Sequence, residues 1–261
     1  MTYQALFLDI DGTILTYDHS YTELTKKAIQ EAQSKGIEVF IATGRPLHEL
    51  DELRAELGIR SAIGYNGAYA VYKNNVILDE PMDHDLVQHT LNLAKEYNNE
   101  LVLYTDQKNL FTSLTHPEVE NFIAHFQLKE NELYPENLAL PIYSMTVMNL
   151  SKEHVPFYKQ LPNLYVSTVN VEGISKAYDL IQKNINKGTA VEKVLAVLGI
   201  PKEQAIAFGD GMNDKEMLQT VGESFVMANG DPNLFPYAKH RTTTVDNSGI
   251  YYGLKKLGII K

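Results

Sequence analysis

The sequence predicts an α/β fold in which a doubly wound, mostly parallel sheet carries an inserted α+β segment. Short apolar runs alternate with amphipathic stretches in residues 1–82 and again in residues 186–261, which is typical of βαβ units. Between residues 83 and 185 the pattern changes to shorter helical and strand-like runs. We therefore expect one α/β domain made of residues 1–82 and 186–261, with residues 83–185 inserted as a separate α+β domain.

The first eighty residues show the clearest alternation. Ala5–Leu8 is a short apolar run, as in a buried strand, and Gly12 marks the following loop. Apolar residues three and four apart predict a helix over 22–35, and Pro46 suits the first turn of another. The elements expected here are strands at 5–8, 37–42 and 61–65, helices at 22–35 and from Pro46 to near Gly58, and a hairpin over 68–80.

The same sequence criteria predict the elements of the inserted segment and of the C-terminal part. In the insert we expect helices at 84–97, 117–127 and 152–160, and strands at 101–105, 110–114, 143–150, 164–171 and 176–182. After Lys187 a helical pattern runs to Gly199 and Pro201, which stop it. Strands are expected afterwards at 204–208, 224–227 and 241–245.

Composition narrows the function classes. The chain has 261 residues, 44% apolar content and a net charge of -10, and it holds no cluster of Lys and Arg. Nucleic acids and anionic membranes reward such clusters, so neither is expected as a partner. The absence of cysteine excludes a thiolate metal site and a thiol nucleophile. Without a basic and apolar leader or a long apolar run, a cytoplasmic location is expected; the oligomeric state stays open.

Polar residues follow several of the expected strands at their carboxyl ends, where open α/β sheets bind ligands. Asp9 and Asp11 alone are equally consistent with a turn, a nearby cation or a protonated pair. Asp214 could cap a helix, and Lys187 could be an ordinary surface lysine. Together, however, the residues offer oxygen ligands for a divalent cation and donors for a phosphate. The set is Asp9, Asp11, Thr43, Asn66, Lys187, Asp210, Asn213, Asp214 and Asn229.

These segments resemble the ordered motifs of the haloacid dehalogenase-like superfamily, and most closely those of the Cof-type phosphatases, which carry a large inserted cap. The likeness spans nearly the whole chain, with Ala228 as a small departure where Gly is more usual. The matching motifs are Asp9-Ile10-Asp11-Gly12-Thr13, Ala42-Thr43-Gly44-Arg45, Asn66-Gly67-Ala68, Lys187-Gly188 and Gly209-Asp210-Gly211-Met212-Asn213-Asp214.

The resemblance implies a magnesium-dependent phosphatase that acts on small phosphorylated metabolites. Asp9 would be the nucleophile that forms an aspartyl phosphate, and Asp11 would be the general acid and base. Thr43 and Lys187 would hold the transferring phosphoryl group. Mg²⁺ would be held by Asp9, the Asp11 carbonyl and Asp210, with support from Asp214 and Asn213. The implied substrate-binding residues are Gly44, Arg45, Asn66, Asn213 and Asn229.

Other functions remain open from the sequence. A sugar-phosphate mutase shares this core and cap, and it differs by returning the phosphoryl group to a sugar hydroxyl. A phosphoaspartate signalling switch would be a single domain without the insert. A nucleotide-binding protein is disfavoured because no phosphate-binding loop of the Gly-x-x-x-x-Gly-Lys-Ser/Thr type is present. The insert is expected to determine which substrate is chosen, and sugar phosphates, phosphorylated cofactors and nucleotide monophosphates all stay open.

Overall fold

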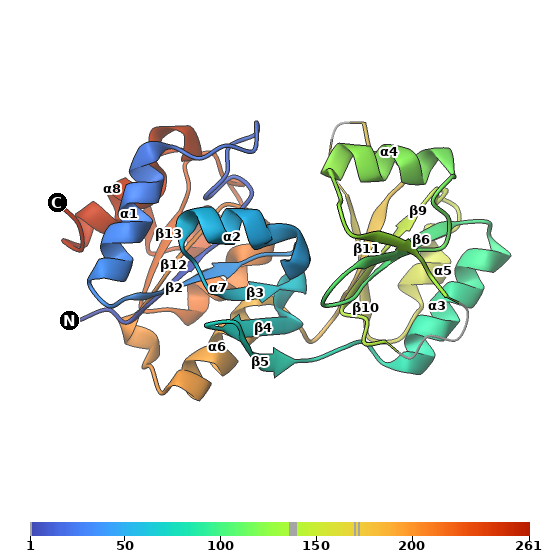
Figure 1. Ribbon diagram of the computed structural model, residues 1–261, viewed down its shortest axis with the longest axis horizontal. Helices are drawn as coiled ribbons and strands as arrows, with labels where there is room; N and C mark the ends of the chain where they lie inside the picture. The colour runs from blue at the N-terminus through green and yellow to red at the C-terminus, as the bar shows by residue number, and fades with distance from the viewer. Residues whose placement is uncertain (1, 136–139, 170, 172) are drawn as a thin grey trace. The chain divides into compact units, whose positions relative to one another are not determined.

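The computed structural model describes residues 2–135, 140–169, 171 and 173–261, which form two compact units (Figure 1). The core unit consists of Met1–Arg45, Asp51–Asp79 and Asn186–Lys261. The insert unit consists of Glu80–Ile185 together with the short segment Pro46–Leu50.

The core unit is built on an eight-stranded sheet of order β14-β13-β12-β1-β2-β3-β4-β5. The strands from β14 to β3 are parallel, whereas β4 and β5 form an antiparallel hairpin at one edge. The order confirms the predicted doubly wound, mostly parallel sheet. The bounds are β1 (Ala5–Leu8), β2 (Glu38–Ala42), β3 (Ser61–Gly64), β4 (Tyr69–Tyr72), β5 (Asn75–Asp79), β12 (Ala205–Gly209), β13 (Glu223–Val226) and β14 (His240–Arg241).

Helices cover both faces of this sheet (Figure 1). On one face α6 (Lys187–Leu198) and α7 (Lys215–Thr220) pack on inward residues of the strands such as Phe7 and Phe40. On the other face lie α1 (Glu23–Ser34), α2 (Asp51–Leu57) and α8 (Gly249–Lys256). Successive strand side chains point to opposite faces, so a run such as Ala5–Leu8, buried throughout, supplies both layers of the core. The 3₁₀ turns are η2 (Tyr65–Gly67), η3 (Lys202–Gln204), η4 (Met212–Asp214), η5 (Phe235–Tyr237) and η6 (Val245–Asn247).

The insert unit has a six-stranded sheet of order β10-β11-β9-β6-β7-β8. Its strands pair antiparallel except for β7 and β8, which are parallel. The helices α3 and α5 pack against one face of this sheet. Leu86 of α3 and Tyr158 of α5 form an apolar core with the strand side chains of that face. The bounds are β6 (Glu100–Tyr104), β7 (Asn109–Phe111), β8 (Asn131–Leu133), β9 (Ser144–Met148), β10 (Leu164–Thr168), β11 (Tyr178–Gln182), η1 (Leu47–Leu50), α3 (His84–Glu96), α4 (Pro117–Phe126) and α5 (Val155–Lys159).

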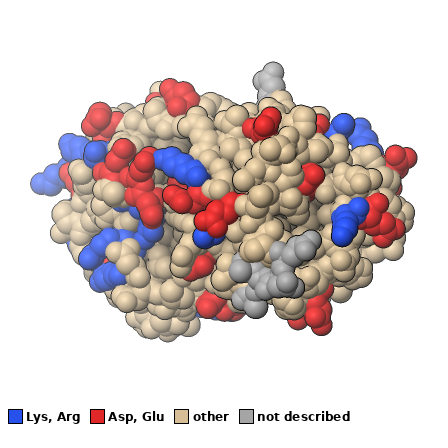
Figure 2. Space-filling model, turned by 45° about the vertical axis from the view of Figure 1, so that its right-hand side comes forward, with Lys and Arg blue, Asp and Glu red and all other residues tan. Residues whose placement is uncertain are grey.

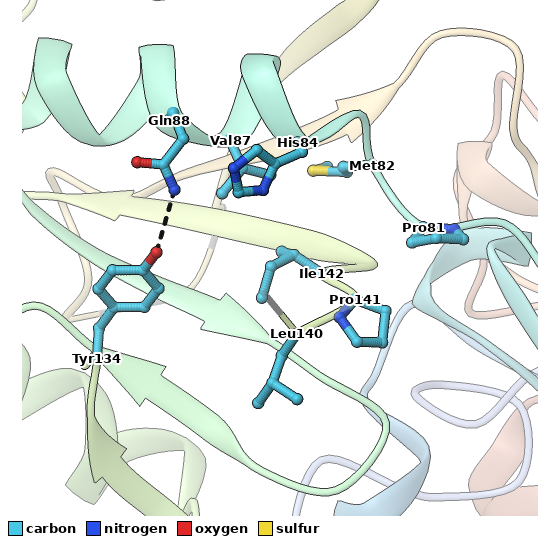
Figure 3. A pocket seen from close by; sticks show the side chains of 9 residues that line it. All are labelled: Pro81, Met82, His84, Val87, Gln88, Tyr134, Leu140, Pro141 and Ile142. Atoms are coloured by element: carbon cyan, nitrogen blue, oxygen red, sulfur yellow. Dashed lines mark hydrogen bonds between the residues drawn. The ribbon is translucent and has the colours of Figure 1, made fainter. Parts of the chain in front are cut away.

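A hollow of about 400 Å³ also lies in the insert unit (Figure 3). Its wall is mainly apolar, and one polar contact crosses it, from Gln88 Nε2 to the Tyr134 hydroxyl at 3.2 Å. The lining residues are Pro81, Met82, His84, Val87, Gln88, Tyr134, Leu140, Pro141 and Ile142.

Several expected elements have different bounds. The helix expected from Pro46 begins as the 3₁₀ turn η1, and α2 starts only at Asp51. The strand expected at 241–245 is the two-residue β14, after which the chain turns into η6. The strand expected at 164–171 ends at Thr168, and residue 170 lies outside the described residues. The strand β8 was not expected at all.

The surface charge and the hydropathy of the helices are consistent with a sequence that has no cluster of Lys and Arg and no long apolar run. On the face drawn in Figure 2, basic side chains are interspersed with acidic ones. Among the described residues, every helix is too short or too polar to cross a membrane.

Candidate active site

Asp9 lies directly after β1, where a tightly folded loop begins. Its amide donates to the carbonyl of Phe208 at 3.1 Å, which extends the pairing of β1 with β12. The carbonyl of Ile10 then accepts from the amides of Thr13, Ile14 and Leu15 at 3.2, 2.9 and 2.8 Å. This bonding fixes the backbone on both sides of Asp11. The apolar strand therefore delivers Asp9 to the sheet edge with only 7% of its surface exposed.

Gly12 makes the close approach of this loop to Asp210 feasible. Its φ of +83° lies in the left-handed region, and a Cβ there would come within 2.3 Å of Asp210 Oδ2. The next residue, Thr13, is fully buried and donates its hydroxyl to Asp210 Oδ1 at 3.1 Å. Thr13 was not among the predicted site residues, although it lies within the first motif. Its contact shows that it orients Asp210.

Lys187 is the central cation of the site. Its side chain is fully buried, and Nζ donates to Asp9 Oδ1 and to Asp214 Oδ1, both at 2.6 Å. Burial lowers the pKa of this ammonium, but the charges of Asp214 and Asp9 outweigh burial and hold it above its ordinary value. Lys187 therefore stays protonated between the two carboxylates.

The sequence holds Lys187 in place at the first turn of α6. Asn186 caps this helix, accepting from the amide of Thr189 at 2.9 Å, and the Thr189 hydroxyl accepts from the Asn186 amide at 3.1 Å. Gly188 lets α7 approach, because a Cβ there would lie 2.5 Å from the carbonyl carbon of Glu216. Asn186 was not among the predicted site residues, although the Asn-x-x-Thr spacing of residues 186–189 is the sequence signal of a capping box.

Asp214 organises the loop between β12 and α7. One of its oxygens accepts from Lys187, and Oδ2 accepts from the amides of Asp210 and Gly211 at 3.0 and 3.1 Å. The side chain is fully buried. Because both oxygens are used, Asp214 fixes the positions of Lys187 and Asp210 at once.

Asp9, Asp210 and Asp214 form a cluster in which one carboxylate oxygen of each lies within 4.8 Å of the others. Burial, followed by the charge of Asp214, raises the pKa of Asp9 and raises the pKa of Asp210 to about 6. Three carboxylates therefore lie around one ammonium group. The net negative charge that results raises the free energy of the folded state, because it is buried away from water. An all-oxygen set of this charge fits a hard divalent cation such as Mg²⁺.

A second group of polar residues follows β2 and β3. The buried Thr43 donates its amide to Ile63 at 2.9 Å, and its carbonyl accepts from Asn66 at 3.1 Å. Asn66 has a φ of 55°, and its side-chain oxygen lies 3.4 Å from Asn213 Nδ2. Gly44 fits against Asn66, since a Cβ on Gly44 would lie 3.1 Å from that side chain. The predicted residues Thr43, Gly44, Asn66 and Asn213 are thus neighbours.

Two predicted substrate-binding residues make contacts that hold loops. Arg45 forms a two-pronged ion pair with Asp11, with Nε donating to Oδ2 at 2.8 Å and Nη2 donating to Oδ1. The side chain of Asn229 donates from Nδ2 to the carbonyl of Gly12 and accepts at Oδ1 from the backbone amide of Val245, both at 2.8 Å. Asn229 therefore ties the loop of residues 9–15 to the segment after β14.

Comparison with known proteins identifies the family. The sequence model of the haloacid dehalogenase-like hydrolase family matches residues 6–254, nearly the entire chain. The chain therefore belongs to this hydrolase family, which confirms the resemblance seen in the motifs and the expectation of an enzyme.

Relatives match along their whole length. "Putative phosphatase YkrA" of Bacillus subtilis is 32% identical over 265 residues and covers 100% of both chains. The 5-amino-6-(5-phospho-D-ribitylamino)uracil phosphatase YitU of the same organism is 27% identical, with 95% of each chain covered. A crystal structure of a Geobacillus kaustophilus protein without assigned function has a TM-score of 0.92 at 28% identity, covering 99% of this chain and 100% of that one.

Proposed function

We propose that this protein is a magnesium-dependent phosphatase that hydrolyses small phosphate monoesters through an aspartyl phosphate on Asp9. The observation that carries the proposal is the buried ion pair of Asp9 with Lys187 inside a cluster of further carboxylates. Such a pair keeps a carboxylate ionised as a nucleophile while a positive charge stands ready for a phosphate. The family and the relatives named as phosphatases support the same chemistry.

In the first step, a carboxylate oxygen of Asp9 attacks phosphorus in line with the ester oxygen. The new Asp9 O–P bond forms as the P–O bond to the alcohol breaks, and the alcohol oxygen takes a proton from the Asp11 carboxyl group. Lys187 offsets the negative charge of the phosphoryl oxygens, and the Thr43 hydroxyl is available as a donor. Positioning and charge stabilisation account for most of the rate in phosphoryl transfer.

In the second step, water attacks the phosphorus of the aspartyl phosphate. Asp11, now ionised, accepts a proton from the water, and the bond between phosphorus and the Asp9 oxygen breaks. Inorganic phosphate leaves, and the Asp9 carboxylate and the protonated Asp11 are restored. The two steps thus use Asp11 first as an acid and then as a base.

Asp9 and Asp210 are the residues proposed to hold Mg²⁺ directly, with the Asp11 carbonyl completing the protein ligands. Asp214 supports them indirectly, because its two oxygens already bind Lys187 and backbone amides. Asn213, at the same loop, completes the polar surroundings. Bound Mg²⁺ would supply positive charge to the phosphoryl oxygens and to the nucleophile.

The insert unit is proposed to select the substrate, with residues 83–185 as the cap domain. A small phosphorylated metabolite, such as a sugar phosphate or a phosphorylated cofactor, is the proposed substrate class. Support comes from the fold likeness to a sugar phosphatase of subclass IIB, BT4131, with a TM-score of 0.82 at 24% identity.

The test is release of inorganic phosphate from an aryl phosphate and from a panel of phosphorylated metabolites, with Mg²⁺ or with chelator. We expect turnover only with Mg²⁺, and for Asp9→Asn a loss of at least roughly 10³-fold. Asp51→Asn, an equal change at an exposed position, serves as the control and should keep full activity. Substantial activity in Asp9→Asn would refute the covalent mechanism. Isomerised sugar phosphate without phosphate release would identify a mutase instead.

A further inference from the structure

The side chain of Asp11 depends on Arg45 for its orientation. The carboxylate is 54% exposed, and within the described residues its hydrogen bonds come from the Arg45 guanidinium alone. Nε of Arg45 donates to one carboxylate oxygen and Nη2 to the other, which is the two-pronged geometry that fixes both direction and plane. Without this partner, an exposed aspartate would rotate among several rotamers.

Arg45 is itself anchored by the backbone that carries the phosphate-binding threonine. Its amide donates to Thr43 Oγ1 at 3.1 Å, and its carbonyl accepts from the amide of Tyr65 at 3.2 Å. The guanidinium is 32% exposed, so the ion pair lies at the surface of the core unit. Surface ion pairs add little to stability, so a stabilising role does not explain this contact. The ion pair instead links the orientation of the Asp11 side chain to the position of the loop after β2.

We infer that Arg45 is a positioning residue that holds the Asp11 carboxyl group in place for its two proton transfers. This inference rests on the proposed function, because it assigns Arg45 to the acid–base step of that reaction. Arg45 acts through Asp11: it moves no proton and forms no bond to phosphorus. Small errors in the placement of a reacting group cost large factors in rate, so loss of the ion pair slows each step that Asp11 serves.

The inference predicts a dependence on the leaving group. An alkyl phosphate leaves as a strongly basic alkoxide and needs the proton from Asp11, whereas p-nitrophenolate leaves readily without one. Arg45→Gln should therefore reduce turnover of an alkyl phosphate by about 10- to 100-fold at saturating Mg²⁺, within the range of general acid catalysis. With p-nitrophenyl phosphate, the first step should proceed normally and the second should slow. A burst of nitrophenolate, close to one equivalent of enzyme, should result.

Matched variants separate this role from others. Asp11→Asn should show the same leaving-group pattern, and the double variant should be no slower than Asp11→Asn alone, because both changes remove one function. Arg45→Lys keeps the charge but makes a single contact and should recover part of the rate. Arg60→Gln removes the same charge from an exposed arginine just before β3, at the opposite end of the strand, and should leave activity unchanged.

The outcomes distinguish the inference from its alternatives. Equal losses in the rate of the first step with both esters, or additive effects of the two changes, would overturn it in favour of a general structural role. A higher KM with unchanged kcat and no burst would overturn it in favour of direct substrate binding by Arg45. Wild-type protein that hydrolyses neither ester would instead refute the proposed function, so the two failures remain distinct.

Discussion

Replacing Lys187 with methionine tests whether charge balance holds the site together. Methionine keeps most of the apolar stem and removes the ammonium, so packing changes little. The loss leaves Asp9 and Asp214 without the cation that each contacts at 2.6 Å, and both are almost fully buried. Breaking a buried ion pair from one side costs about 3–5 kcal/mol, because the remaining charge has no compensation.

This free energy translates into a measurable change in melting temperature. For a unit of 150–250 residues, roughly 2–4 °C are lost per kcal/mol, so Lys187→Met should melt about 6–20 °C below the wild type in chelator. Mg²⁺ should restore a large part of the loss, since a ligand at 100 times its Kd stabilises the folded state by about 2.7 kcal/mol. Activity should stay low even with Mg²⁺, because Lys187 also contacts the phosphoryl group in the proposed mechanism.

The assay is a thermal unfolding scan with chelator and with a Mg²⁺ titration. Lys193→Met, at an exposed position of the same helix, is the control and should melt close to the wild type. A Lys187→Met protein that melts within about 2 °C of the wild type in chelator would refute the reasoning, since the carboxylates would then not need a cation.

Three further perturbations act on other parts of the structure. Gly188→Ala should destabilise the protein by about 1–3 kcal/mol in urea unfolding, because the added Cβ would lie 2.5 Å from Glu216. Alanine normally stabilises a helix relative to glycine, so a gain in stability would contradict the close packing of α6 and α7. Asn229→Ala should lower the free energy of unfolding by about 1–3 kcal/mol and reduce kcat, because the carbonyl of Gly12 and the amide of Val245 each lose a partner. Unchanged kcat would show that the loop of residues 9–15 does not need this tie. Burial raises the pKa of Asp179 from 3.8 to about 6, so its ionisation opposes folding as pH rises through that range. In urea unfolding, the free energy of unfolding of Asp179→Asn should increasingly exceed that of the wild type between pH 4 and pH 7, by up to about 3 kcal/mol. A difference independent of pH would show that ionisation of Asp179 does not oppose folding.

The parallel core was predictable because its strands are buried on both faces. Ala5–Leu8 and Ala205–Gly209 are uninterrupted apolar or small-residue runs, and each is followed at once by an aspartate. In a parallel sheet these ends share one edge, so the position of Asp9 beside Asp210 follows from the strand pattern. The same logic brings Thr43 and Asn66 together after β2 and β3.

Other features have no local signal. The strand β8 is an edge strand of three residues in which Leu133 is 57% exposed, so it shows no periodic burial. The contact of Thr13 with Asp210 joins residues 197 positions apart, and nothing near Thr13 indicates its partner. Likewise the pairing of Asp11 with Arg45 depends on how β1 and β2 align. Such contacts are set by tertiary structure.

The charges of the site give a physical reason for the proposed metal dependence. A nucleophilic carboxylate must be ionised, yet burial and the charges of Asp214, Asp210 and Asp11 together raise the pKa of Asp9 in spite of Lys187. A further positive charge near Asp9 and Asp210 would act in the same direction as Lys187 and lower both pKa values. The proposed need for a divalent cation thus follows from the carboxylates that the first and last of the five motifs bring to one sheet edge. A variant with fewer of them would bind the cation more weakly and also need it less.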